Sequence, residues 1–337
     1  MNSNEIDINF KEFLDNHAQQ QKNLFSGTLE KNYQYQSEHN PIFSSFIDEF
    51  PSHSADKDAI PLLPIEAFRE AKVMAGLNSD YDLLFESSGT TGMRKSRHFV
   101  KEEKIYRSSL LEGFRHFYPL DEMVILAYTP GYADNPNSSL IWMLKELISQ
   151  DQTGMSRFLP LEKEIPESLI MEITSSGKKV MLFGAAFGFL DMIERYPITL
   201  PADSLIMETG GMKTHRREVS RAELHQKLSD GFGLPLHQIH SEYGMTEMLS
   251  QAYCRDGLWF EPVPWLAVSI RNPENPLEVV PDGERGLLGI IDLANVHSCS
   301  FILTKDIGLR RADGAFQVLG RYRHSNLRGC NFLIDDE

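Results

Sequence analysis

Cysteine is scarce in this 337-residue sequence, which contains three: Cys254, Cys299 and Cys330. The number is odd, the three residues lie far apart, and no Cys-x-x-Cys pair occurs. The sequence therefore indicates neither a disulfide framework nor a cysteine-based zinc site. Because free thiols persist in reducing compartments, this cysteine content predicts a cytoplasmic protein.

Long apolar runs and basic residues are also in short supply. The longest apolar run, residues 180–190, falls short of the roughly 18 residues that a membrane-spanning helix needs. Lysine and arginine number 33 against 48 acidic residues, which gives a formal net charge of −15. A surface that binds the nucleic-acid backbone is normally basic, so nucleic acid is not expected among the partners.

The most informative stretch is dense in glycine and hydroxyl residues and follows an apolar run at 81–85. It consists of Ser87, Ser88, Gly89, Thr90, Thr91 and Gly92. Glycines let backbone N–H groups approach an anion, and hydroxyls add further donors. Lys95 and its basic neighbours supply positive charge beside them. The stretch predicts a polyphosphate site or, alternatively, a flexible surface turn. It is not a Walker A loop, because Arg94 stands where that pattern needs glycine.

Strand-like and helix-like segments alternate after this loop. Helices are expected at 102–117, 138–149, 167–176, 187–195 and 220–228, and strands at 123–128, 179–183 and 204–207. This alternation predicts an α/β core with a mostly parallel sheet flanked by helices. Ligands of such folds bind at the carboxyl ends of strands, where residues 87–92 are expected to lie.

The last quarter of the sequence has a different character. Short strands are expected at 259–270, 286–293, 300–303 and 316–319, with Asp-Gly turns between them. The chain is therefore expected to form three parts. These are a helical N-terminal segment packed on the core (1–80), an α/β nucleotide-binding core (81–253), and a β-rich subdomain with a short C-terminal tail (254–337).

Three further segments carry groups suited to a nucleotide. Gly210-Gly211 would let a flat ring approach the backbone, or would form a simple tight turn. The run 240–247 concentrates a histidine, an aromatic ring, a hydroxyl and two carboxylates, and oxygen ligands such as Glu247 suit Mg²⁺ that bridges phosphates. Its alternative is a solvated helix start. Asp306 and Arg321 flank a hairpin, where they could bind ribose and phosphate oxygens or form a surface ion pair.

The order of these motifs resembles that of the adenylate-forming superfamily of acyl-CoA ligases and related enzymes. The motifs are SSGTTG, GG, YGMTE, a lone aspartate and GR. The resemblance covers residues 85–321 and implies that superfamily's α/β large-domain fold. It also implies a role for each motif. Residues 87–92 would be the phosphate loop, Gly210-Gly211 the adenine turn, Tyr243 the adenine lining, Gly244 a further nucleotide-binding residue, Thr246 and Glu247 the Mg²⁺-phosphate contact, Asp306 the ribose ligand, and Arg321 the hinge-side arginine.

Most members of the superfamily continue past the GR motif with a lid domain of about 100 residues that carries a catalytic lysine. Here residues 322–337 follow, so neither lid nor lysine is expected. Three segments, 60–68, 208–221 and 327–337, resemble the acyl-protein synthetase (LuxE-like) family more closely. In that family a cysteine near the C-terminus carries the acyl group as a thioester. Cys330 stands at the matching place; its alternative is a small buried hydrophobe.

This resemblance implies ATP- and Mg²⁺-dependent activation of a carboxylic acid, of the fatty class, to acyl-AMP, followed by transfer to a protein thiol. Expected partners are the acid and an acyl-accepting or reductase protein. The candidate catalytic residues are Cys330, Lys95 beside the phosphate loop, and His240, which would orient the carboxylate. Residues 183–190 would line the acyl pocket or pack as core. A phenylacetate-CoA ligase-like enzyme with a separate lid or partner, and a non-catalytic nucleotide-binding protein, remain the alternatives.

Overall fold

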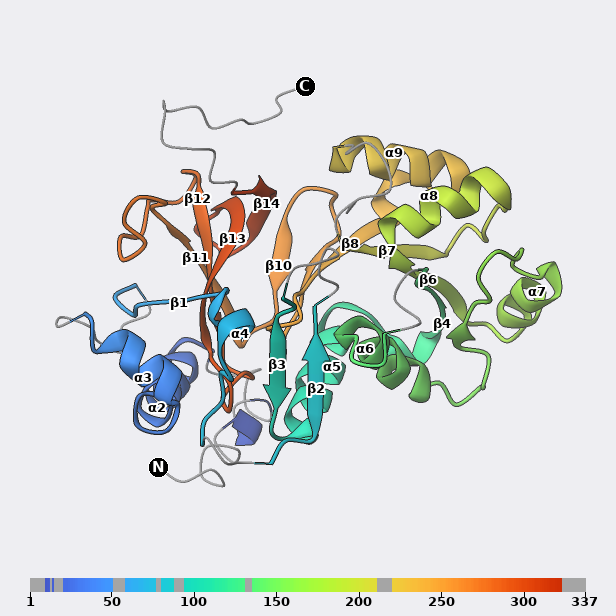
Figure 1. The fold of residues 1–337 in the computed structure, drawn as a ribbon. Coiled ribbons are helices and arrows are strands. Elements are labelled where there is room, and N and C mark those ends of the chain that lie inside the picture. Colours follow the sequence, from blue (N-terminus) through green and yellow to red (C-terminus); the bar gives the residue numbers. More distant parts are fainter. Residues whose placement is uncertain are drawn as a thin grey trace. The chain divides into compact units, whose positions relative to one another are not determined.

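The computed structural model describes residues 10–12, 14, 21–50, 58–76, 80–87, 94–130, 135–210 and 220–322. The chain divides into two compact units (Figure 1). One comprises Asp80–Pro264, and the other comprises Met1–Ser79 together with Trp265–Glu337. None of the described helices is long and apolar enough to cross a membrane.

The unit Asp80–Pro264 is built on a mixed sheet with the strand order β10-β9-β8-β7-β6-β4-β5. The pairs from β5 to β8 are parallel, and β9 and β10 continue antiparallel. The strands are β4 (Met123–Tyr128), β5 (Arg157–Phe158), β6 (Lys179–Ala185), β7 (Leu205–Thr209), β8 (Ile239–Tyr243), β9 (Ala252–Cys254) and β10 (Phe260–Pro262).

Helices cover both faces of this sheet. In Figure 1, α8 and α9 lie over one face and α5 and α6 over the other. β4 is buried along its whole length, as expected for a strand enclosed by two helical layers. The helical elements are α5 (Glu103–Phe117), η1 (Leu120–Glu122), α6 (Ser139–Ser149), α7 (Glu167–Ser175), α8 (Ala186–Arg195), α9 (Arg221–Phe232) and η2 (Leu236–Gln238).

Local signals start and stop these helices. Ser138 caps α6 by accepting a hydrogen bond from the Ile141 N–H, and Ser220 caps α9 by accepting one from the Glu223 N–H. The expected start of a helix at Ser220 is thereby confirmed. α9 runs to Phe232, four residues past its expected end, and stops where Gly233 takes the left-handed conformation that favours glycine.

The second unit contains an antiparallel sheet of β11 (Leu266–Arg271), β12 (Gly286–Asp292), β13 (Phe301–Arg310) and β14 (Phe316–Arg321). The short β1 (Leu63–Pro64) pairs in parallel with β13. The described helices of this unit include α2 (Gln21–His39), α3 (Pro41–Ile47) and α4 (Ala67–Glu70). The expected strand at 259–270 is wrong, because it separates into β10 and β11 around a turn that contains Pro264.

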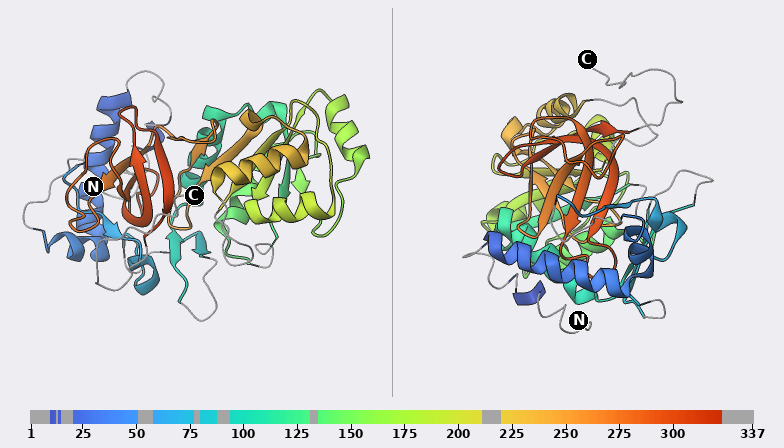
Figure 2. Two further views of the ribbon diagram at one scale, coloured as in Figure 1. Left: turned by 90° about the horizontal axis from the view of Figure 1, so that it is seen from above. Right: turned by 90° about the vertical axis from the view of Figure 1, so that its left-hand side faces the viewer.

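α2 packs beside the β12–β13 sheet (Figure 2), and buried polar side chains join it to the connection between these strands. Asn32 donates to the Leu293 carbonyl, Gln36 to the Val296 carbonyl, and Asn40 to the carbonyl of Ser298. Asn32 and Gln36 are four residues apart, so they lie on one face of α2, and Asn40 follows the last residue of the helix. They satisfy backbone carbonyls that would otherwise be buried without partners.

Candidate active site

The serine-, threonine- and glycine-rich loop connects the two strands of a β-hairpin. β2 (Leu83–Glu86) pairs antiparallel with β3 (Arg97–Val100) in a separate two-stranded sheet. The expectation that the loop follows a strand of the parallel sheet is therefore wrong. Of the four β2 side chains, that of Phe85 alone is fully buried, a pattern that suits a hairpin better than a central strand.

Reciprocal hydrogen bonds close the neck of this loop. The Ser87 N–H donates to the Ser96 carbonyl over 3.1 Å, and the Ser96 N–H donates to Ser87 Oγ over 3.0 Å. Lys95 is nearly half exposed, with its Nζ 3.6 Å from Glu86 Oε2. The neck thus brings a serine hydroxyl and a lysine to the start of the loop. The other five loop residues, Ser88 to Gly92, lie outside the described residues.

The ends of β7 and β8, which lead into the Gly210-Gly211 and YGMTE motifs, lie side by side. In this parallel pair Thr209 lies opposite Glu242, and the Thr209 hydroxyl donates to the Glu242 carboxylate. Gly210 follows with a φ of +77°, a left-handed conformation that favours glycine. Gly211 lies outside the described residues. The hydrogen bond between Thr209 and Glu242 therefore joins the two residues that immediately precede Gly210-Gly211 and the YGMTE run.

Glu242 is a buried carboxyl in an unusual state. Burial raises its pKa to about 7, and the nearby Glu208 carboxylate adds to the rise, while the bond from Thr209 opposes it. A Cβ on Gly244 would lie 2.5 Å from Glu242 Oε1, so a side chain at that position would collide with the carboxyl. A side chain at position 244 would therefore have to displace the end of the Glu242 side chain.

The opposite face of the same two strands contacts α9. His225 Nε2 lies 3.0 Å from Ser241 Oγ and 3.5 Å from Glu208 Oε1. Side chains alternate between faces along a strand, so Ser241 and Glu208 share the face toward α9, whereas Glu242 and Thr209 point away from it. Polar contacts therefore fix the ends of β7 and β8 from both sides.

His240 is buried with both ring nitrogens engaged. Its Nε2 lies 3.1 Å from the His237 carbonyl, which can only accept, so Nε2 carries the hydrogen. Its Nδ1 lies 3.0 Å from the Tyr118 hydroxyl, which then donates to the neutral ring. Burial lowers the pKa of His240 to about 4. The expected role of His240 toward a carboxylate stays a prediction, and it would require one of these bonds to break.

The YGMTE run itself lies at the end of β8 and in the turn that follows. Tyr243 is buried beside the Phe260 ring, with the ring centroids 5.7 Å apart. Glu247 is also buried, and the Thr246 carbonyl accepts a hydrogen bond from His98 Nδ1 over 2.8 Å. The alternative of a solvated helix start is therefore wrong.

The expected Mg²⁺ role of Glu247 stays a prediction, in which phosphates would supply most of the ligands. Among the described residues, no group of three or more histidine, cysteine, aspartate or glutamate side chains could hold a metal ion. Mg²⁺ in nucleotide sites keeps several waters and takes one or two protein carboxylates together with substrate phosphates. A single carboxylate next to Thr246 meets that requirement.

Asp306 and Arg321 belong to the other unit, where they face each other on β13 and β14. Arg321 Nε lies 3.8 Å from Asp306 Oδ1; the arginine side chain is 53% exposed and the aspartate side chain 18%. The expected placement on either side of a hairpin is confirmed. Their nucleotide-binding roles stay predictions.

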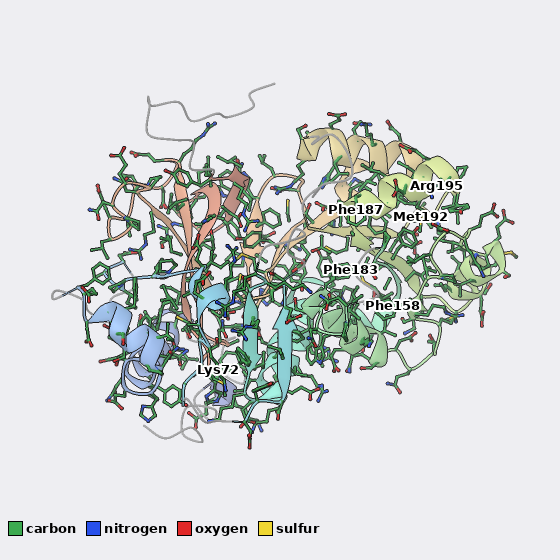
Figure 3. The ribbon with its side chains drawn as sticks, viewed as in Figure 1. Lys72, Phe158, Phe183, Phe187, Met192 and Arg195 are labelled. Carbon is green, nitrogen blue, oxygen red and sulfur yellow. The ribbon has the colours of Figure 1, made fainter. Side chains whose placement is uncertain are left out.

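The described cysteines are poor nucleophiles. Cys254 and Cys299 are fully buried, and burial raises the pKa of each thiol to about 12. Cys330 lies outside the described residues. Within residues 183–190, Phe183 of β6 is fully buried and Phe187 of α8 is half-buried near the same strand–helix junction (Figure 3). Ala186, Phe189 and Leu190 belong to a hydrophobic core cluster, and an acyl-pocket role for this segment stays a prediction.

Sequence reasoning missed the contacts that organise this region. Nothing in the sequence pairs His98 with Thr246, which is 148 positions away, or Tyr118 with His240. The one local signal was the composition around them, because a histidine in a short apolar strand and a tyrosine at a helix end both need polar partners when buried.

Comparison with known proteins places the chain. The sequence profile "Acyl-protein synthetase, LuxE" matches residues 149–337, which is more than half of the chain. The chain belongs to this family. A long-chain-fatty-acid–luciferin-component ligase of Vibrio harveyi is 24% identical over 339 residues, covering 93% of this chain and 87% of the relative. The ligase of the same name from Aliivibrio fischeri is 26% identical over 278 residues, covering 75% of this chain and 69% of the relative.

Solved structures show the same fold for this LuxE family member. A 2-hydroxyisobutyryl-CoA ligase in complex with 2-HIB-AMP and CoA superposes with a TM-score of 0.61 and 14% identity, over 89% of this chain and 69% of that one. ATP-bound MatB from Rhodopseudomonas palustris gives a TM-score of 0.52 and 17% identity, over 73% of this chain and half of that one. The fold is that of the adenylate-forming ligases, and the predicted fold class is confirmed.

Proposed function

We propose that this protein uses ATP and Mg²⁺ to activate a long-chain fatty acid as acyl-AMP and then transfers the acyl group to a protein thiol. The observation that carries the proposal is the LuxE family match over residues 149–337, which includes the YGMTE run, Asp306, Arg321 and Cys330. The two bacterial relatives, both named as long-chain fatty-acid ligases, support a fatty acid as the substrate class.

The first step needs positioning more than proton transfer. A carboxylate oxygen attacks the α-phosphorus of ATP, and the bond to the bridging oxygen breaks as pyrophosphate leaves with the electron pair. Two anions must be held together in line, so the protein contributes orientation and charge neutralisation. We assign donors to residues 87–92 and positive charge to Lys95. Glu247 would hold Mg²⁺, which when bound neutralises charge on the triphosphate.

The nucleoside is assigned to three other motifs. Gly210-Gly211 would accommodate the adenine with Tyr243 and Gly244, while Asp306 would accept the ribose hydroxyls and Arg321 would contact phosphate or sugar oxygens. His240 would orient the incoming carboxylate. A cytoplasmic setting fits a protein that uses ATP and carries buried free thiols.

Acyl transfer is assigned to Cys330. Its thiolate attacks the acyl carbonyl of the adenylate, the carbon–oxygen bond to phosphate breaks, and AMP leaves, giving a thioester on sulfur. Burial and a raised pKa disfavour Cys254 and Cys299 for this role. A thioester remains reactive, so an acyl-accepting or reductase protein would be the next partner.

The test combines two assays. Pyrophosphate exchange should depend on fatty acid, ATP and Mg²⁺, and labelled fatty acid should appear on the protein in a hydroxylamine-labile form. Cys330→Ser should keep exchange and lose the label, whereas Cys254→Ala and Cys299→Ala should keep both. Failure of every fatty acid to support exchange would refute the proposal. AMP release that requires CoA, without labelled protein, would indicate an acyl-CoA ligase instead.

A further inference from the structure

The hairpin that carries the predicted phosphate loop is anchored by contacts outside the main sheet. β2 and β3 pair with each other in their own sheet. On the β2 side, the Glu86 N–H donates to the Asn137 carbonyl over 2.9 Å. On the β3 side, His98 reaches the Thr246 carbonyl over 2.8 Å. Backbone and side-chain contacts of this kind, and not a ladder shared with the main sheet, therefore hold the β2–β3 hairpin.

His98 is well suited to act as an anchor. It is completely buried and lies opposite Phe85, two residues beyond the Ser96 that closes the neck of the loop. A carbonyl oxygen can only accept, so the Nδ1 of His98 must carry the hydrogen of this bond. Thr246 sits in the turn between β8 and β9, where its carbonyl has no place in a strand ladder.

We propose that His98 is a positioning residue that holds the Thr246-Glu247 turn in register with the hairpin of the phosphate loop. This inference rests on the proposed function, in which the loop and the turn contact the same triphosphate. Reactive groups must be held to within about 0.5 Å of productive geometry, and a misplacement of about 1 Å can cost about a hundredfold in rate. The partly buried 2.8 Å bond between His98 and Thr246 limits such displacement.

Side-chain isosteres distinguish anchoring from simple space filling. The amide nitrogen of asparagine can occupy the place of the imidazole Nδ1, whereas that of glutamine falls near Nε2. Leucine fills a similar volume without any donor. If His98 only fills space, leucine should be tolerated best at this position, or all three replacements should behave alike. The anchor predicts that asparagine alone restores function.

The experiment compares wild type with His98→Asn, His98→Gln and His98→Leu. Pyrophosphate exchange should fall about tenfold or more in kcat for the Leu and Gln variants, with a smaller change in the KM for fatty acid, and His98→Asn should stay within about threefold of wild type. Hydrogen–deuterium exchange of the nucleotide-free proteins supplies a second readout. Amides at 245–249 should exchange faster in His98→Leu and as in wild type in His98→Asn.

Each outcome decides the inference. Wild-type kcat and wild-type amide exchange in His98→Leu would overturn it, as would equal impairment of all three variants. If His98→Leu does not fold, the contrast between the Asn and Gln variants still decides. If the wild-type protein shows no pyrophosphate exchange with any fatty acid, the proposed function fails. Hydrogen–deuterium exchange of His98→Leu and His98→Asn still shows in that case whether His98 holds the turn.

Discussion

Replacing Glu242 with glutamine tests the most unusual electrostatic feature of the site. Glu242 lies buried at the end of β8, accepts a hydrogen bond from Thr209, and has a pKa raised to about 7 from its usual 4.5. Glutamine has nearly the same shape, and its carbonyl can still accept the bond from Thr209. The substitution therefore removes the titration while keeping the packing.

The magnitude follows from proton linkage. Between pH 4.5 and 7 the folded protein retains a proton on Glu242 that the unfolded chain releases. The raised pKa therefore contributes stability that is fully present below pH 4.5 and is lost as the pH rises through 7. This interval is about 2.5 pH units, and each is worth about 1.36 kcal/mol. Relative to wild type, Glu242→Gln should gain about 3 kcal/mol in unfolding free energy between pH 4.5 and 8.

Urea-induced unfolding from pH 4.5 to 8, followed by tryptophan fluorescence, measures this gain as the difference between the two proteins. Glu172→Gln on the exposed face of α7 is the matched control for the loss of one carboxylate and should parallel wild type. If the unfolding free energies of Glu242→Gln and wild type run parallel over this range, the reasoning about burial is wrong. It is also wrong if the variant becomes less stable relative to wild type as the pH rises.

Three further substitutions test other parts of the site. Glu247→Gln should leave the protein folded by circular dichroism but abolish fatty-acid-dependent pyrophosphate exchange; full exchange would remove its Mg²⁺ role. Asp306→Ala should weaken ATP binding by more than about tenfold in calorimetry, because each hydrogen bond to a charged group is worth roughly 1.5–3 kcal/mol. His240, whose pKa is lowered from 6.5 to about 4, contributes stability that is present above pH 6.5 and lost as the pH falls through 4. His240→Gln should therefore lose less stability than wild type between pH 7 and 4 in urea unfolding, by up to about 3 kcal/mol.

Local chemistry in the sequence was sufficient to predict many elements. β4 begins and ends at the predicted residues, because a fully apolar run between polar segments suits a strand that is buried on both faces. α6 and α9 begin after Ser138 and Ser220, because a serine cap satisfies backbone N–H groups wherever the helix packs. The order of the motifs likewise identified the family, since that information lies in the chain itself.

Tertiary structure alone decided which segments meet. Whether β2 joins the large sheet or forms a hairpin depends on competing partners that lie far apart in sequence. The bonds from His98 to Thr246 and from Thr209 to Glu242 depend on the same long-range choices. The raised pKa of Glu242 follows from burial, which no short sequence window specifies. Propensities and caps act within a few residues, whereas register, burial and side-chain pairing are settled by packing the whole unit.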